Sequence, residues 1–198
     1  MIDLSNIDAL IFDCDGTLLD TPPIYARAWA AGLRKTGKQM PRQWFMDHAA
    51  LSDHVLMDAF EHEFAVKIPD RAGAIETMRQ VFFSQLDDLK EITAVAQIAR
   101  ANHGKRRLAV ASGGARPVVM PCLKATGLFD LFDAIVTIED VSAPKPAPDL
   151  FLKAAERLDT DPVRCFVFED TRTGLDASRA AGMNCVDVAQ IIRQQDQA

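Results

Sequence analysis

Short runs of consecutive apolar residues constrain the fold of this chain more than any other feature. The clearest runs span residues 9–12, 108–111, 134–138 and 165–168, and a weaker fifth run spans 185–188. A strand with one wet face alternates apolar and polar residues, whereas a continuously apolar strand is buried on both faces. Such strands, separated by helical segments, are typical of a parallel sheet that helices cover on both sides. The sequence therefore predicts an α/β fold with a Rossmann-like parallel sheet.

Helix signals fill the intervals between the later runs. A helix is expected over 150–158, after a Pro-Asp start, and another over 174–181, which a glycine follows. A third helix is expected over 116–126, with Pro117 in its first turn. Pro121 would remove one hydrogen bond from the interior of that helix, so either a kink or a later start is expected.

The interval from about residue 21 to residue 86 breaks this alternation, because it carries helical patterns and no convincing strand. Within it, Ser52 is expected to cap a helix whose apolar positions lie between 55 and 64, and Asp70 is expected to cap the next helix. An all-helical insert directly after the first strand is expected to form a lid at that strand's carboxyl end. Ligands of open α/β sheets bind at that end.

Two domains follow from this pattern. Residues 1–19 and 88–198 are expected to form the α/β core, and residues 20–87 are expected to form a small helical cap, or lid. The 198 residues are enough for one good-sized domain or for a core with a small inserted module.

Composition and charge exclude several kinds of partner. The net charge is −6, so no general basic field draws the chain to nucleic acid or to anionic lipid. No apolar run approaches the roughly 18 residues that span a bilayer, and the acidic N-terminus lacks the pattern of a secretion signal. The four cysteines are scattered without CxxC spacing, which favours reduced thiols. We therefore expect a cytoplasmic protein, a monomer or weak dimer, with no nucleic-acid or membrane partner.

Two aspartates, Asp13 and Asp15, directly follow the first apolar run. Residues two apart in extended backbone point the same way, so both carboxylates can face one site at the strand end. Adjacent acids repel each other unless a cation joins them or one holds a proton, and hard oxygen ligands of this kind suit magnesium. Gly16 permits a tight departure from the strand, and Thr17 can satisfy backbone groups of the loop. Taken alone, the pattern also fits an acidic strand-to-turn junction.

Polar residues also follow the second apolar run and the third. Ser112-Gly113-Gly114 ends the second run, and a hydroxyl followed by glycine amides at a helix start can seat an anion. Taken alone, Ser-Gly-Gly is an ordinary turn. Lys145 lies after the third run between two prolines, which lower the entropy cost of presenting its side chain. Taken alone, it also fits a solvated loop lysine.

The fourth apolar run ends in an acidic pair, Glu169-Asp170, with a glycine four residues after the second acid. An acidic pair at a strand end is common, so this pattern is weak in isolation. The position of the acidic pair makes the pattern stronger, because all four groups of polar residues follow apolar runs. The carboxyl ends of parallel strands meet at one edge of a sheet, so these groups are expected to converge.

The segment Asp13-Cys14-Asp15-Gly16-Thr17-Leu18-Leu19-Asp20 resembles the first motif of the haloacid dehalogenase (HAD) superfamily, in its phosphatase form. The resemblance implies that Asp13 attacks phosphorus to give an aspartyl-phosphate. It also implies that Asp15 protonates the leaving oxygen and then activates the water that hydrolyses the acyl phosphate.

The other three groups resemble the remaining motifs of the superfamily, in the right order. The resemblance implies that Ser112, with Gly113 and Gly114, binds the phosphate and that Lys145 neutralises both the nucleophile and the phosphate. It implies a Mg²⁺ ion held by Asp13, the backbone carbonyl of Asp15 and Asp170, with Glu169 as a further or water-mediated ligand.

A helical insert after the first motif fits the branch that includes β-phosphoglucomutase and the sugar-phosphate phosphatases. Residues 21–29 resemble the mutase's lid entrance, including Trp29, but Tyr25 replaces a histidine. An ungapped placement puts Asp53 where the mutase has an arginine for the distal phosphate, and an aspartate would repel that phosphate.

The expected function is therefore magnesium-dependent hydrolysis of a small phosphorylated metabolite, such as the sugar monophosphate fructose 1-phosphate. Two alternatives remain. One is a β-phosphoglucomutase-type phosphosugar mutase. The other is a non-catalytic phosphate-binding regulatory protein on the same fold, for which loss of Asp13 or Asp15 would be the expected mark. Trp29 and Trp44 are expected either to pack in the core of the lid or to line a sugar pocket.

Overall fold

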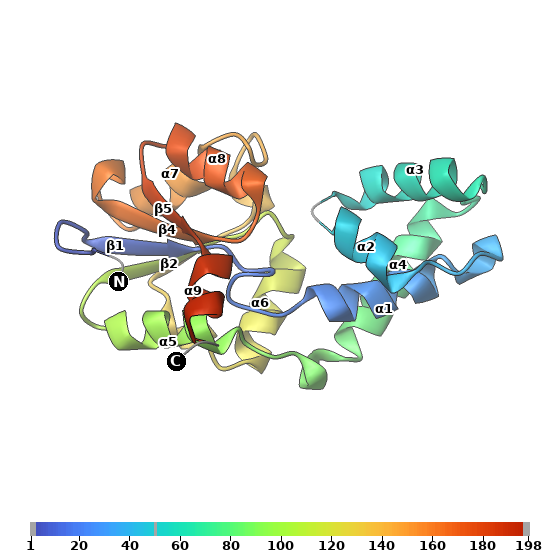
Figure 1. Ribbon diagram of the computed structural model, residues 1–198, viewed down its shortest axis with the longest axis horizontal. Coiled ribbons are helices and arrows are strands. Elements are labelled where there is room, and N and C mark those ends of the chain that lie inside the picture. Colours follow the sequence, from blue (N-terminus) through green and yellow to red (C-terminus); the bar gives the residue numbers. More distant parts are fainter. Residues whose placement is uncertain (1–2, 50, 196–198) are drawn as a thin grey trace. The chain divides into compact units, whose positions relative to one another are not determined.

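A computed structural model describes residues 3–49 and 51–195, and the chain forms two compact units (Figure 1). The first unit combines Met1–Asp20 with Lys90–Ala198, and the second is Thr21–Leu89. The insert expected from the sequence, 20–87, starts one residue earlier and ends two residues earlier than this second unit. No helix of the described residues is both long and apolar enough to cross a membrane.

A five-stranded sheet forms the centre of the first unit, and all its strand pairs are parallel. The strands, in chain order, are β1 (Ala9–Phe12), β2 (Arg107–Ala111), β3 (Ala134–Val136), β4 (Cys165–Glu169) and β5 (Asn184–Asp187). Their order across the sheet is β3-β2-β1-β4-β5. Every residue of β1 is buried, because this central strand is covered on both faces. The predicted Rossmann-like α/β class is confirmed.

Helices cover both faces of this sheet (Figure 1). They are α5 (Thr93–Asn102), α6 (Arg116–Ala125), α7 (Asp149–Arg157), α8 (Arg172–Ala180) and α9 (Val188–Gln195), with α7 and α8 on one face and the others on the opposite face. On the α7 side, Leu150 and Phe151 pack with Ile11 and Val167 of the central strands. Elsewhere in the core, the rings of Phe12 and Phe168 stack at 4.6 Å.

Three local predictions need correction. The run 134–138 is a strand only as far as Val136, because the Thr137 amide donates to the Asp140 carboxylate at 2.8 Å and so starts a 3₁₀ turn. The fifth run is shifted by one residue, since Val188 begins α9. Helix α6 begins at Arg116 with Pro121 inside it, so the alternative of a later start is wrong. Pro121 costs that helix one bond, to a carbonyl of its first turn.

The second unit contains four helices in its described residues: α1 (Pro22–Gly32), α2 (Arg42–His48), α3 (Asp53–Phe64) and α4 (Arg71–Phe83). Asp70 caps α4 as predicted, with its carboxylate accepting from the Gly73 amide at 2.8 Å. Ser52 occupies the N-cap position of α3 but makes no cap hydrogen bond there. Trp29 and Trp44 are buried, and the Trp44 indole donates to Glu63 at 2.8 Å, so both belong to the packed interior of this unit.

Backbone hydrogen bonds join the segment where the chain leaves the first unit to the segment where it re-enters that unit. The Asp20 amide donates to the Lys90 carbonyl at 2.9 Å, and the Ile92 amide donates to the Leu18 carbonyl at 2.8 Å. The segment before the insert and the segment after it are therefore tied together within the first unit.

Candidate active site

The candidate active site lies at the carboxyl end of the sheet, where register brings the first and fourth motifs together. Phe12 of β1 pairs with Phe168 of β4, so the next residues, Asp13 and Glu169, lie at adjacent strand ends. The Asp13 amide continues the pairing by donating to the Phe168 carbonyl at 3.0 Å. Both acidic side chains are buried. Strand pairing alone thus places two carboxylates side by side, away from water.

Lys145 joins these two carboxylates. Its Nζ donates to Asp13 Oδ1 and to Glu169 Oε2, each at 2.6 Å, and it lies 5.0 Å from the centre of the Phe151 ring. Burial alone would lower the pKa of Lys145, but the charges of Asp13 and Glu169 outweigh it and raise that pKa above its ordinary value. Lys145 is therefore a fixed positive charge, held from the loop between β3 and α7.

Glu169 uses both of its oxygens. While Oε2 accepts from Lys145, Oε1 accepts from the Thr171 amide at 2.9 Å, from the Thr171 hydroxyl at 2.7 Å and from the Asp170 amide at 3.1 Å. Burial alone would raise the pKa of Glu169, but Lys145 and Thr171 hold it below its ordinary value. A Cβ atom at Gly174 would overlap the Glu169 carboxyl group, so only glycine leaves room for this side chain.

Asp170 is held from the opposite side by Thr17. The Thr17 hydroxyl, which is fully buried, donates to Asp170 Oδ1 at 3.0 Å. A Cβ atom at Gly16 would overlap this carboxylate, which explains the glycine at that turn, where φ is +83°. Desolvation of the carboxyl group and then the Glu169 charge raise the pKa of Asp170 to about 7, although the residue as a whole is exposed to solvent.

Asp13 lies in surroundings that disfavour its negative charge unless a cation is close by. Burial, and then the Glu169 charge, raise the pKa of Asp13 well above its usual range, and Lys145 opposes them. Oxygen atoms of Asp13, Glu169 and Asp170 all lie within 4.8 Å of one another. Three carboxylates against one lysine leave a net negative charge, and carboxylate oxygen is the donor type that Mg²⁺ prefers. The donor set therefore fits a divalent, oxygen-seeking metal ion.

The second motif forms a small loop on the other side of the site. Ser112 follows β2, is buried, and accepts from the Gly114 amide through its Oγ at 3.0 Å. A Cβ atom at Gly114 would lie 3.2 Å from Ser112 Oγ and 3.4 Å from Asp15 Oδ2, so the Asp15 carboxylate borders this loop. The Gly113 amide donates to no described residue, which leaves it available to an anion.

The structure places the site residues expected from the sequence in two groups. Asp13, Lys145, Glu169 and Asp170 form one connected group, and Asp15 lies beside the Ser112–Gly114 loop. Two supporting residues were missed as such: Thr17, expected to satisfy the loop backbone, bonds the Asp170 side chain instead, and Thr171 holds Glu169. The position of Thr171, an N-cap just after the acidic pair, was the available signal.

A parallel sheet whose strand ends present these acids, this lysine and this glycine loop defines an α/β protein with a polar, cation-seeking site at the carboxyl ends of its strands. The family model of the haloacid dehalogenase-like hydrolases matches residues 7–182. The chain belongs to that family, which confirms the resemblance seen in its motifs.

Individual relatives agree with this membership. The chain is 36% identical, over 179 residues, to the fructose-1-phosphate phosphatase YqaB of Escherichia coli (strain K12), covering 90% of this chain and 95% of the relative. It is 29% identical to a phosphorylated carbohydrates phosphatase of Thermotoga maritima, covering 89% and 82% of the two chains. Among solved structures, CbbY from Rhodobacter sphaeroides in complex with phosphate matches with a TM-score of 0.78, 25% identity and coverage of 90% and 84%.

Proposed function

We propose that this protein is a magnesium-dependent phosphatase of a sugar monophosphate, with fructose 1-phosphate as the first substrate to test. The observation that carries the proposal is the placement of Lys145, 2.6 Å from both Asp13 and Glu169 and next to the acidic cluster with Asp170. A carboxylate can attack an anionic phosphate only where positive charge offsets their repulsion. The similarity to the Escherichia coli fructose-1-phosphate phosphatase supports the choice of substrate.

In the proposed reaction, a carboxylate oxygen of Asp13 attacks phosphorus, and the bond from phosphorus to the ester oxygen breaks. Asp15 gives its proton to that leaving oxygen, so the sugar departs as a neutral alcohol. Asp15 then takes a proton from water, and the hydroxide formed attacks the aspartyl-phosphate. Inorganic phosphate leaves, and both aspartates return to their starting states.

The remaining residues provide charge and position. Ser112 and the Gly113 amide are the donors for the phosphate oxygens, and Lys145 neutralises Asp13 and the phosphate. Asp13, Asp170 and the carbonyl of Asp15 would hold Mg²⁺, which when bound supplies a second positive charge against the phosphate. Glu169 serves best as the residue that positions Lys145, because both its oxygens already accept hydrogen bonds from protein donors.

One observation keeps the phosphosugar mutase as a second candidate. The Arg79 guanidinium lies 3.9 Å from the Asp53 carboxylate in the second unit. Asp53 is therefore accompanied by a cation, and the repulsion expected of it towards a distal phosphate is partly offset. Incubation with Mg²⁺ and β-glucose 1-phosphate separates the two activities. Glucose 6-phosphate that forms faster than free phosphate would favour the mutase.

The proposal is tested by measuring phosphate release from a panel of sugar and nucleotide monophosphates, with Mg²⁺ and with EDTA. We expect turnover that needs Mg²⁺, that is greatest for a hexose monophosphate and that Asp13→Asn abolishes. Residual turnover in Asp13→Asn would contradict the covalent mechanism. Absence of turnover across the whole panel would favour the non-catalytic, phosphate-binding alternative.

A further inference from the structure

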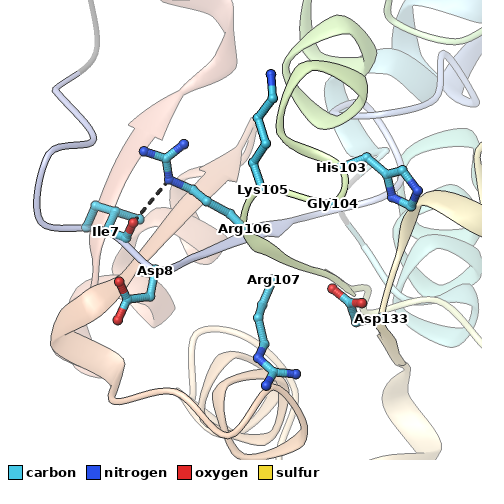
Figure 2. Close-up of a pocket in the computed structure, with 8 residues that line it drawn as sticks. All are labelled: Ile7, Asp8, His103, Gly104, Lys105, Arg106, Arg107 and Asp133. Atoms are coloured by element: carbon cyan, nitrogen blue, oxygen red, sulfur yellow. Dashed lines mark hydrogen bonds between the residues drawn. The ribbon is translucent and has the colours of Figure 1, made fainter.

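An open cavity of about 640 Å³ lies at the amino ends of the strands (Figure 2). The candidate active site lies at their opposite, carboxyl ends. The lining of the cavity comes from the amino ends of three neighbouring strands: Asp8 before β1, residues 103–106 before β2 with Arg107 as its first residue, and Asp133 before β3. Its volume falls within the roughly 300–1,000 Å³ of small-molecule sites. Asp8 and Asp13 are five positions apart along extended chain, so this cavity lies roughly 16 Å from Asp13.

The cavity is basic although the chain is acidic. Residues 103–107 read His-Gly-Lys-Arg-Arg, in a chain whose net charge is −6. This segment joins α5 to β2, and Gly104 turns it with a φ of +72°, where an added Cβ would meet nothing within 4 Å. Lys105, Arg106 and Arg107 follow one another along this segment, and their side chains diverge from it, with Lys105 on one side, Arg107 on the other and Arg106 between them (Figure 2).

Only some of the basic side chains in the segment 103–107 are held by hydrogen bonds to the protein. Arg106 is committed to structure, because its guanidinium donates to the Ile7 carbonyl at 3.1 Å and to Asn102 Oδ1 at 2.6 Å. Among the described residues, Lys105 Nζ donates only to the Ala101 carbonyl, at 2.9 Å, which neutralises no charge. Within residues 3–49 and 51–195, the Arg107 guanidinium has no hydrogen-bond or ion-pair partner.

The two carboxylates of the lining cancel only part of these charges. Asp8 already pairs with Arg164, whose Nη2 lies 2.7 Å from Asp8 Oδ1. Asp133 accepts from the neutral Leu108 amide at 2.8 Å and keeps its negative charge, so it offsets one of the three positive charges of Lys105, Arg106 and Arg107. The cavity therefore keeps an excess of positive charge that the described residues leave uncompensated.

We propose that this cavity binds a small anion that carries several linked phosphate groups. Lys105 and Arg107 point in opposite directions from the segment 103–107, with Arg106 between them (Figure 2). A ligand that contacts both side chains must therefore be extended. A chain of phosphates meets this requirement, and a single phosphate does not. The lining contains no Phe, Tyr or Trp, so recognition rests on charge rather than on base stacking. The site is separate from the strand ends that carry the hydrolytic residues and does not depend on the proposed function.

The test is a titration of the ¹⁵N-labelled protein with sodium tripolyphosphate in EDTA, followed by amide chemical shifts. We expect saturable shifts at Gly104 and Lys105, distinct from any shifts at Gly113 and Gly114 at the other edge of the sheet. Arg107→Ala should weaken binding about tenfold, since it removes charge-assisted hydrogen bonds at an exposed site. Added salt should also weaken binding, because the charges are solvent-accessible.

Lys153→Ala is the matched control, since this half-exposed lysine pairs with Glu156 away from the cavity. This variant should bind tripolyphosphate as tightly as the unmodified protein. The Arg107→Ala protein should keep the phosphatase activity and the melting temperature of the unmodified protein. If Arg107→Ala does not fold, Lys105→Ala is tested in its place. Shifts confined to Gly113 and Gly114, shifts that never saturate, or an unchanged affinity in the folded cavity variant would each overturn the proposal.

Discussion

Glu169→Gln separates two roles for the second acid of the fourth motif, metal ligand and positioning residue. The substitution keeps the size of the side chain and one carbonyl oxygen for the Thr171 donors. It removes the negative charge and leaves an amide NH₂ where Oε2 now accepts from Lys145 at 2.6 Å. Lys145 would then keep only Asp13 as a charged partner, and its ammonium group would be less firmly held between the strand ends.

The size of the effect follows from that single contact. A hydrogen bond between charged groups contributes about 1.5–3 kcal/mol, which corresponds to about a 10- to 150-fold fall in kcat if the contact is needed in the transition state. The affinity for Mg²⁺ should change little, because the metal would be held by Asp13, Asp170 and a backbone carbonyl. Removal of the Glu169 charge should also lower the pKa of Asp170, since that charge is one cause of its elevation.

The assay is steady-state phosphate release at saturating substrate over a Mg²⁺ titration, with metal affinity measured separately by calorimetry. Glu156→Gln is the matched control, because it makes the same chemical change in an exposed pair with Lys153 and should leave both quantities unaltered. The reasoning would be refuted if Glu169→Gln kept its full kcat at saturating Mg²⁺ while its metal affinity fell tenfold or more. That result would make Glu169 a direct ligand.

Three further predictions test other parts of the site. Gly174→Ala should lower the free energy of unfolding by about 1–3 kcal/mol, because the added methyl group overlaps the buried Glu169 carboxyl. Urea denaturation checks this, and Gly113→Ala, whose Cβ would meet nothing within 4 Å, should change stability little. Thr17→Val keeps the shape of the side chain but removes its hydrogen bond to Asp170. Mg²⁺ affinity, measured by calorimetry, should therefore fall severalfold, by about 1 kcal/mol. An unchanged affinity would mean that Asp170 does not need this hydrogen bond to bind the ion. Finally, Mg²⁺ affinity should rise as pH passes through about 7, because Asp170 must release a proton held with a pKa of about 7 before it can bind the ion. In the metal-free protein the same group contributes stability that is fully present below the pKa of the unfolded chain and is lost as pH rises through about 7. A metal affinity that stays constant between pH 5 and 8, measured by calorimetry across that range, would contradict the role of Asp170.

The convergence of the four motifs could be predicted from sequence because it depends only on strand direction. Once residues 9–12 and 165–168 are recognised as parallel buried strands, the residues that follow them must meet at one edge. Finer details depended on side-chain packing, which no local pattern encodes. The bond from Thr17 to Asp170 joins residues 153 positions apart, and the sequence offered only a backbone role for this hydroxyl.

The helices that sequence analysis did not anticipate were those with ambiguous patterns. Helix α5 buries mainly small residues, including Ala94, Ala96 and Ala99, which suit many environments equally well. The early end of β3 has a different cause, because the apolar run continues to Ile138 while the Asp140 side chain captures the Thr137 amide. In each case a tertiary or side-chain interaction decided between structures that the local sequence permits.

The paired backbone at the base of the insert makes the second unit exchangeable. Because Leu18 and Asp20 are bonded to Ile92 and Lys90 inside the first unit, the ends of the inserted segment are held a fixed short distance apart. Any replacement segment whose termini fit that spacing can be accepted without disturbing the sheet or the acids at its strand ends. We therefore expect the helical module to tolerate replacement or lengthening while the acids at the strand ends stay in place.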